Sequence, residues 1–170
     1  MNRYLKLIFT AAVVFASANL FAQNLKFGHI NSSELIQAMP QTKQADSSLK
    51  AFGGSLDSQL KGMTAEYQGK LQSYQGKRDS LPDAIRVTKE KELEDLGNRI
   101  QDFQQTAQES IQKRKEELYG PILKKAEAAI KDIAKEKGYS YIFDTSQGTV
   151  LYAQDSDNMM PMVKAKLGLK

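Results

Sequence analysis

The feature that most limits how this chain can fold is a pair of matching apolar stripes on either side of Leu81-Pro82. Before this dipeptide, apolar residues recur every three or four positions, as on one face of a helix; they are Leu49, Phe52, Leu56, Leu60, Met63, Tyr67, Leu71 and Tyr74. After it, the same spacing recurs at Leu93, Leu96, Ile100, Phe103, Ala107, Ile111 and Leu118. Pro82 disfavours helical geometry at Leu81 and suits the first turn of a new helix. The pattern therefore predicts two long helices folded back on each other.

The position of the reversal also predicts which residues pack together. If the chain turns between Leu81 and Pro82, residues whose numbers add up to 163 lie opposite each other, and five successive layers are apolar on both sides. These layers pair Tyr67 with Leu96, Met63 with Ile100, Leu60 with Phe103, Leu56 with Ala107, and Phe52 with Ile111. We expect these ten residues to form the core of an antiparallel helical hairpin over residues 42–119. Its arms of about 40 residues would reach roughly 60 Å at 1.5 Å per residue.

Residues 23–41, before the arms, predict the first part of a small body. Leu25 to Ile30 has the composition and alternation of a short strand. Ser32 or Ser33 is placed to cap a short helix that Pro40 stops.

Residues 120–170, after the arms, predict the rest of this body. Gly120-Pro121 interrupts the helical pattern, which then resumes as a re-entrant helix as far as Gly138. Residues 139–143 and 149–153 alternate as the two strands of a β-hairpin, and polar residues at 155–158 can cap a terminal helix. The expected fold is therefore α+β and mostly α: a long antiparallel helical hairpin on a small body of β-strands.

The body is too small to close its own sheet. Three short strands at the foot of a long arm leave exposed edges, which association of identical chains would cover. We expect oligomerisation through the body, with cyclic symmetry pointing all arms the same way. The residues expected at this contact are Leu25, Phe27, Tyr139, Tyr141, Phe143, Val150 and Tyr152.

The first 22 residues have the pattern of a cleavable signal peptide. Arg3 and Lys6 precede an apolar run from Leu7 to Ala16, which is too short to span a bilayer comfortably. Small residues follow, and cleavage after Ala18 and cleavage after Ala22 both fit. The mature protein is expected to be exported.

The composition argues against catalysis and against nucleic-acid binding. The chain has no Cys and a single His, so thiolate and most histidine chemistry is excluded. Neighbouring carboxylates at Glu90, Glu92, Glu94 and Asp95 are spread around an exposed helix. Removal of Arg3 and Lys6 leaves 22 basic and 20 acidic residues, a charge of +2, which supplies no basic face for nucleic acid. We predict no enzyme activity, no metal site and no cofactor.

Lys26 to Asn31 and Ile36 to Pro40 precede the arms, Leu118 to Ile122 lies where the second arm meets the body, and residues 138–144 and 148–153 follow. These local strings, in this order around the hairpin, resemble the OmpH/Skp family of periplasmic chaperones. They are similar to the family's first strand and the segment after it, to the point where its long helix re-enters the body, and to its closing hairpin. Members of this family are trimers whose helical tentacles enclose a cavity for unfolded outer-membrane proteins. The resemblance thus implies a homotrimeric, coiled-coil periplasmic chaperone.

The expected function is that of an ATP-independent holdase for unfolded outer-membrane β-barrel proteins. No G-x-x-x-x-G-K-[ST] loop is present. Candidate client contacts are the apolar residues around the tip, which are Tyr74, Leu81, Pro82, Ile85 and Val87. Basic residues outnumber acidic ones there, which also fits weak contact with a membrane surface or lipopolysaccharide. The alternative is an exported coiled-coil spacer or adaptor of the cell envelope without chaperone activity.

Overall fold

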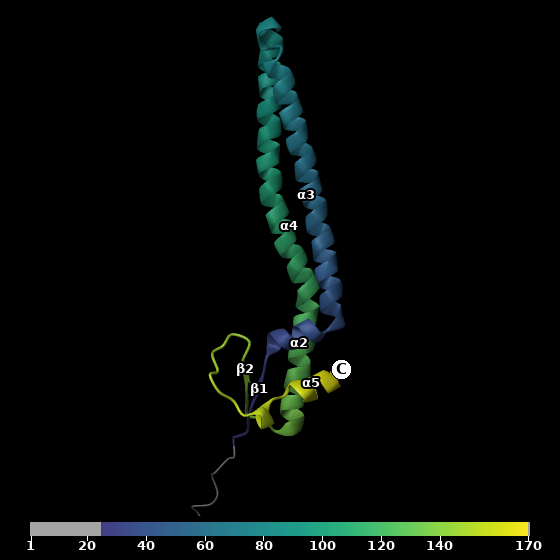
Figure 1. Ribbon diagram of the computed structural model, residues 1–170, viewed down its shortest axis with the longest axis vertical. Helices are drawn as coiled ribbons and strands as arrows, with labels where there is room; N and C mark the ends of the chain where they lie inside the picture. Colours follow the sequence, from purple (N-terminus) through teal and green to yellow (C-terminus); the bar gives the residue numbers. More distant parts are fainter. Residues whose placement is uncertain (1–24, 170) are drawn as a thin grey trace, which may run out of the picture.

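The computed structural model describes residues 25–169, in which a long helical hairpin stands on a small body (Figure 1). In chain order the elements are β1 (Phe27–Ile30), α2 (Ser32–Ala38), α3 (Pro40–Gln75), the short 3₁₀ helix η1 (Arg78–Ser80), α4 (Asp83–Lys137), β2 (Tyr141–Asp144), the 3₁₀ helix η2 (Asp155–Asp157) and α5 (Met160–Lys166). The expected fold class is confirmed. The expected signal peptide, residues 1–22, lies outside the described residues.

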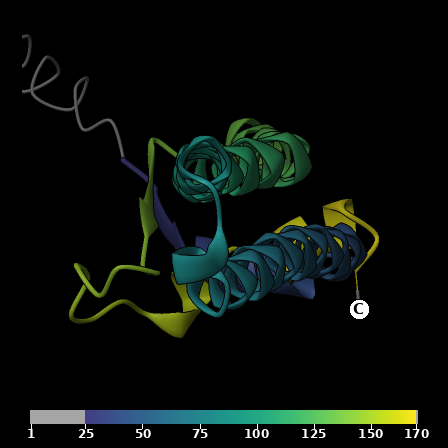
Figure 2. The ribbon, with the colours of Figure 1, turned by 90° about the horizontal axis from the view of Figure 1, so that it is seen from above.

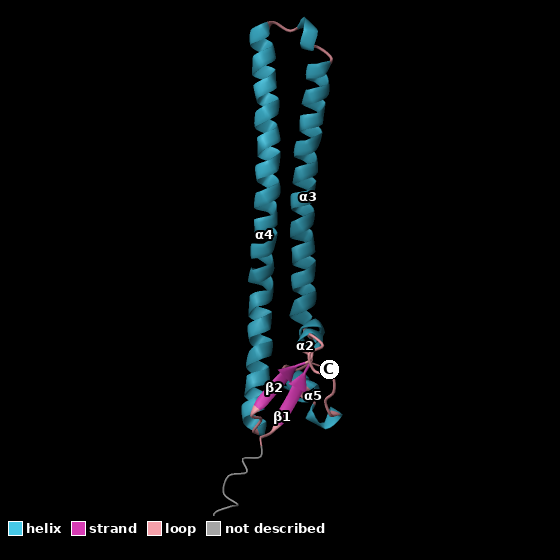
Figure 3. Cartoon of the chain, turned by 90° about the vertical axis from the view of Figure 1, so that its left-hand side faces the viewer, coloured by secondary structure: helices cyan, strands magenta, loops and turns pink. Residues whose placement is uncertain are grey.

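The hairpin consists of α3 and the first part of α4, which run side by side in two perpendicular views (Figures 2 and 3). At 1.5 Å per residue, the 36 residues of α3 rise about 54 Å. The helix begins at Pro40, two residues before the expected start, because a proline is tolerated in the first turn. The reversal occupies Gly76 to Pro82, where Leu81 is extended and Pro82 caps α4.

The expected interruption at Gly120-Pro121 is wrong, because α4 continues through it to Lys137. A proline inside a helix removes one backbone hydrogen bond and costs about 3 kcal/mol. The continuation buries Ile122 and Ile133, each 5 % exposed, against the body. Their burial contributes roughly 3 to 6 kcal/mol, which offsets the cost of the proline. The re-entrant helix is therefore the lower part of the second arm.

The expected β-hairpin is also wrong: β2 pairs with β1, in parallel, and residues 149–153 form no strand. The register sets Phe27 against Tyr141 and Ile30 against Asp144. The parallel direction of the two strands follows from their connection through the helical hairpin. β1 leads up into the ascending arm, whereas α4 descends and reverses at Gly138, whose positive φ of 70° suits this turn. Both strands therefore run from the foot towards the arms.

The Asp144 carboxylate diverts the chain after β2. It accepts hydrogen bonds from the Ser32 N–H (3.1 Å), the Ser32 hydroxyl (2.5 Å) and the Ser146 N–H (2.9 Å). The first two tie the end of β2 to the start of α2, and the third bends the chain into a turn. Residues 149–153 then border the outer face beside Phe27 and Phe143, and Asn158 pairs with His29 at the other edge of β1.

The body has its own apolar core beneath the sheet. The side chains of Ile30, Leu35, Met39, Met159 and Val163 are fully buried and come from both ends of the chain. Asn31 caps α2 by accepting from the Glu34 N–H at 3.1 Å, one residue before the expected cap at Ser32 or Ser33. The core joins the segments before and after the hairpin, which fixes the feet of both arms.

Glycine-to-alanine substitutions in the arm and in the body should have opposite effects on stability. Gly54, inside α3, has nothing within 4 Å of an added Cβ, so Gly54→Ala should stabilise the protein by about 0.5 to 1 kcal/mol. Gly28 in β1 lies where a Cβ would approach the Tyr139 ring and the Met159 sulfur to 2.9 Å. We expect Gly28→Ala to destabilise the protein by about 1 to 3 kcal/mol, measured as a shift in the urea midpoint. Equal shifts of one sign would contradict this packing.

The Asp144 contact predicts a specific loss of stability in acid. Burial acts to raise the pKa of Asp144, but the hydrogen bonds from Ser32 and Ser146 outweigh it and hold the pKa below its usual value. The ionised carboxylate thus stabilises the fold above pH about 4, and this contribution is lost as the pH falls through the depressed pKa. The gap in urea midpoint between wild type and Asp144→Asn should therefore narrow from pH 7 to pH 2.5.

The exposed Asp102 on α4 provides the control, since no hydrogen bond or ion pair to it is found among the described residues. The small difference between wild type and Asp102→Asn should vary little with pH. A gap for Asp144→Asn that stays constant down to pH 2.5 would show that this carboxylate does not hold the turn.

Candidate interaction surfaces

At two places along the hairpin, the contacts between the arms agree with the expected register. The Tyr67 ring lies 3.8 Å from the position of a Cβ at Gly97. Nearer the body, Leu56 and Leu60 share a groove with Phe103 and Ala107. In each case the facing residues have numbers that add up to about 163, so the structure sets the two stripes against each other.

Two tyrosine hydroxyls link the arms, one near each end of the hairpin. The Tyr74 hydroxyl donates to the Glu90 carboxylate near the tip, and the Tyr119 hydroxyl donates to Asp46 near the body. The hydrogen bond to Asp46, together with slight burial, raises the pKa of Tyr119. Both contacts join α3 to α4 and oppose sliding of one arm along the other.

Two helices cannot enclose their shared stripe. Among the stripe residues only Leu93 and Leu96 are buried, at 8 % and 4 % exposure. The rest are half-buried, apart from Ile111, which is exposed; the half-buried ones are Leu49, Phe52, Leu56, Leu60, Met63, Tyr67, Leu71, Tyr74, Ile100, Phe103, Ala107 and Leu118. A groove of about 360 Å³ opens between the arms at mid-length. The hairpin therefore offers a lengthwise apolar strip as well as an internal contact.

The candidate residues at the tip divide into two groups. Ile85 and Val87 are 46 % and 64 % exposed, and Pro82 is exposed beside them. Tyr74 and Leu81 instead lie half-buried along a notch of about 370 Å³ between the arms. The outward apolar surface of the tip is thus carried by the first turn of α4.

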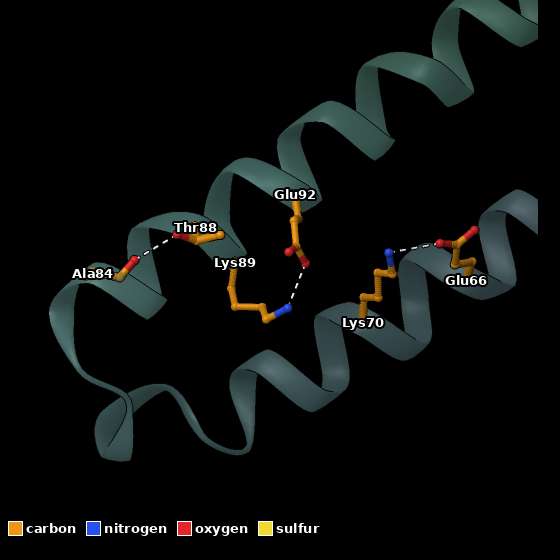
Figure 4. A network of polar contacts seen from close by, with 6 residues as sticks. All are labelled: Glu66, Lys70, Ala84, Thr88, Lys89 and Glu92. Atoms are coloured by element: carbon orange, nitrogen blue, oxygen red, sulfur yellow. Dashed lines mark hydrogen bonds and ion pairs between the residues drawn. The ribbon is translucent and has the colours of Figure 1, made fainter.

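Three of the six basic residues between positions 70 and 91 pair with acidic neighbours, and two of these pairs are shown in Figure 4. Lys70 lies 2.9 Å from Glu66 and Lys89 lies 2.8 Å from Glu92; Arg86 pairs with Asp83. The hydrogen bond from Lys89 holds the pKa of Glu92 below its usual value. Such exposed pairs add at most about 1 kcal/mol each to stability. They nevertheless reduce the positive potential that the sequence predicts at this end.

The outer face of the sheet is aromatic and exposed. The Phe27 ring stacks on Tyr141 with centroids 6.0 Å apart and lies 6.2 Å from Phe143. These three side chains are 46 %, 60 % and 49 % exposed, and Leu25 beside them is 52 % exposed. Monomeric proteins rarely expose such a cluster, which is typical of an interaction surface.

The remaining residues predicted for the body contact lie in different places. Tyr139 is half-buried against the inner face, below the Lys26 ammonium at 4.1 Å, and so does not share the aromatic surface. Val150 and Tyr152 line a cavity of about 550 Å³ between the aromatic face and the loop after β2. The sequence prediction omitted Leu151, which is 98 % exposed. An alternating strand would have pointed it away from Val150 and Tyr152.

The described residues contain no group of three or more His, Cys, Asp or Glu side chains arranged to hold a metal ion. His29 stands alone on the outer face of β1, with its Nε2 3.1 Å from the Gln154 carbonyl oxygen. Within residues 25–169, no helix combines the length and apolar character needed to cross a bilayer.

Comparison with known proteins identifies the family. Residues 26–167 match the family model described as outer membrane protein (OmpH-like). The chain belongs to the OmpH/Skp family. It is 25 % identical over 146 residues to the chaperone protein Skp of Pectobacterium atrosepticum, covering 86 % of this chain and 88 % of that one. The Skp protein of Photorhabdus luminescens is 26 % identical, covering 81 % and 82 % of the two chains.

A solved structure supports the OmpH/Skp fold. The crystal structure of an OmpH-like protein from Caulobacter crescentus CB15 superposes with a TM-score of 0.73, at 15 % identity, over 84 % of this chain and 83 % of that one. The family predicted from the local strings is therefore confirmed. It is a family of chaperones and not of enzymes.

Proposed function

We propose that this OmpH/Skp protein is an ATP-independent periplasmic holdase that shields unfolded outer-membrane β-barrel proteins between its helical arms. The observation that carries the proposal is the stripe of the hairpin, which remains half-exposed along its length after the arms have packed. An unfolded barrel strand presents apolar side chains at every second position. A long, shallow apolar strip can cover such segments without reading their sequence.

The proposed assembly is a homotrimer held by the body. The aromatic surface of Phe27, Tyr141 and Phe143 is exposed in the single chain and would be covered by association of copies. The number three comes from the resemblance to the family. With the bodies joined about one axis, the three hairpins would extend in the same direction and surround a common space.

Capture should rest mainly on apolar contact. The mature chain has a charge of only +2, and three of the six basic residues between positions 70 and 91 are paired. Client binding holds the unfolded state in solution. Release then follows from the more favourable folding of the client into a membrane, with no nucleotide step. For the same reason, contact of the tip with a membrane surface or lipopolysaccharide is proposed only as a weak interaction.

The holdase activity is tested by dilution of a urea-unfolded outer-membrane barrel protein into buffer with purified mature protein. At one trimer per client, we expect light scattering to fall to a small fraction of the value without the protein. The Ile85→Ser, Val87→Ser double variant should need several-fold more protein for the same effect, since it removes the exposed apolar surface of the tip.

Ala84→Ser is the matched control, because it adds a hydroxyl at an exposed position of the same helical turn. It should leave the effect unchanged, and all three proteins should keep the wild-type urea midpoint. If wild-type protein does not reduce scattering but binds a folded envelope protein tightly, the envelope spacer or adaptor is the better account. A tip variant that acts like wild type would place client contact elsewhere on the hairpin.

A further inference from the structure

The groove between the arms at mid-length differs from the tip in the charge of its lining. Asp57 is the one charged residue that lines it, and Asp57 is paired with Lys61 at 2.7 Å. The rest of the lining is apolar or uncharged and consists of Gly53, Leu56, Leu60, Phe103, Gln104, Ala107, Gln108 and Ile111. The notch near the tip lies between the same two helices but is lined by three lysines and Glu92. The mid-length groove is therefore the less charged of these two hollows.

Two glutamine side chains border the mid-length groove without a partner in the chain. Gln104 and Gln108 are exposed, and no hydrogen bond to either side chain is found among the described residues. The neighbouring Gln105 instead donates to Glu109 on the same helix. A side-chain amide offers both donors and acceptors. Gln104 and Gln108 can therefore bond to the backbone N–H and C=O groups of a bound chain, whatever the sequence of that chain.

The length of the groove suits an extended segment. Along α4 the lining runs from Phe103 to Ile111, which is about 12 Å at 1.5 Å per residue. An extended chain covers this distance with about four residues and points two of their side chains to the same face. These two side chains meet the apolar lining while the backbone passes the glutamines. A helix offers the glutamines no partner, because its backbone groups are already paired with each other.

We infer that the mid-length groove binds short, extended and uncharged segments of the unfolded client. Alternate apolar side chains of the segment pack against Leu60 and Phe103, and its backbone bonds to Gln104 and Gln108. The inference rests on the proposed holdase function and names the part of the hairpin and the class of segment. Barrel strands alternate apolar side chains in this way. A charged segment is disfavoured, because its charge would lose hydration without gaining a counter-charge.

A fluorophore sensitive to its surroundings tests the contact directly. The chain has no cysteine, so the label can be attached at Gln104→Cys or at Gln59→Cys alone. Both positions are exposed and lie at the same level of the hairpin, but Gln59 is about 100° round α3 from Leu60 and does not line the groove. Addition of a urea-unfolded barrel protein should shift the emission at position 104 to the blue and leave position 59 nearly unchanged. The dissociation constant from this titration should be similar at low and at high salt, because the contact is uncharged.

Two pairs of carboxylates measure the contribution of the groove without a label. Gln104→Glu with Gln108→Glu places two charges where the client's apolar side chains bind. The matched control is Ser55→Glu with Gln59→Glu, which has the same spacing at the same levels on exposed positions outside the groove. The protein needed to halve the light scattering should rise about tenfold or more for the first pair and less than about twofold for the control. Both variants should keep the wild-type urea midpoint.

Four results would overturn the inference. They are equal emission shifts at positions 104 and 59, equal losses from the two carboxylate pairs, a dissociation constant that rises steeply with salt, and a shift at position 104 that grows with protein concentration when no client is present. The last result would assign the groove to a second copy of the chain. Suppression of scattering without a shift at position 104 refutes this groove alone. A client-dependent shift without suppression of scattering refutes the holdase function alone.

Discussion

The structure depends above all on the contact between two apolar stripes that run antiparallel for most of the chain. An amphipathic helix of this length is stable in water only when its apolar side is covered, so neither arm can fold alone. Each arm supplies the surface that the other needs, and Tyr74 and Tyr119 fix the register with hydrogen bonds to carboxylates of the opposite arm. Since two helices cover only part of their shared stripe, the same contact that stabilises the hairpin also leaves apolar surface available for binding.

The hairpin and the body depend on each other through α4. Because this helix continues through Pro121, its upper part packs against α3 and its lower part against the sheet, α2 and α5. The tentacle is thus an extension of a core element and not an appended domain. The parallel pairing of β1 with β2 has the same origin, since one strand leads into the ascending arm and the other follows the descending one. The aromatic surface of the body and the apolar strip of the hairpin are consequently connected through one continuous helix, α4.

The sequence predicts the features that depend on the spacing of apolar residues. It does not predict the features in which contacts between distant segments of the chain outweigh local preferences. The stripes and the break at Pro82 follow from spacing along the chain, and the groove shared by Leu56, Leu60, Phe103 and Ala107 agrees with the predicted layers. The interruption at Pro121 was expected from local preference, but burial of Ile122 and Ile133 outweighs it. The β-hairpin was expected from alternation, but the Asp144 carboxylate, held by Ser32 from the other end of the chain, diverts the loop. The exposed Leu151 could be recognised only once the sheet was known.

The central claim, that the two arms pack face to face about one reversal, is tested most directly by the distance between spin labels on opposite arms. Nitroxides can be placed at exposed positions at two levels of the hairpin, by combining Lys61→Cys with Asp102→Cys and Gln72→Cys with Lys91→Cys. With labelled chains diluted in unlabelled protein, both pairs should give similar short distances, of about 10 to 25 Å for neighbouring helices plus their labels. A single continuous helix would separate the first pair by about 60 Å and the second by about 28 Å, and distances of that size would contradict the account.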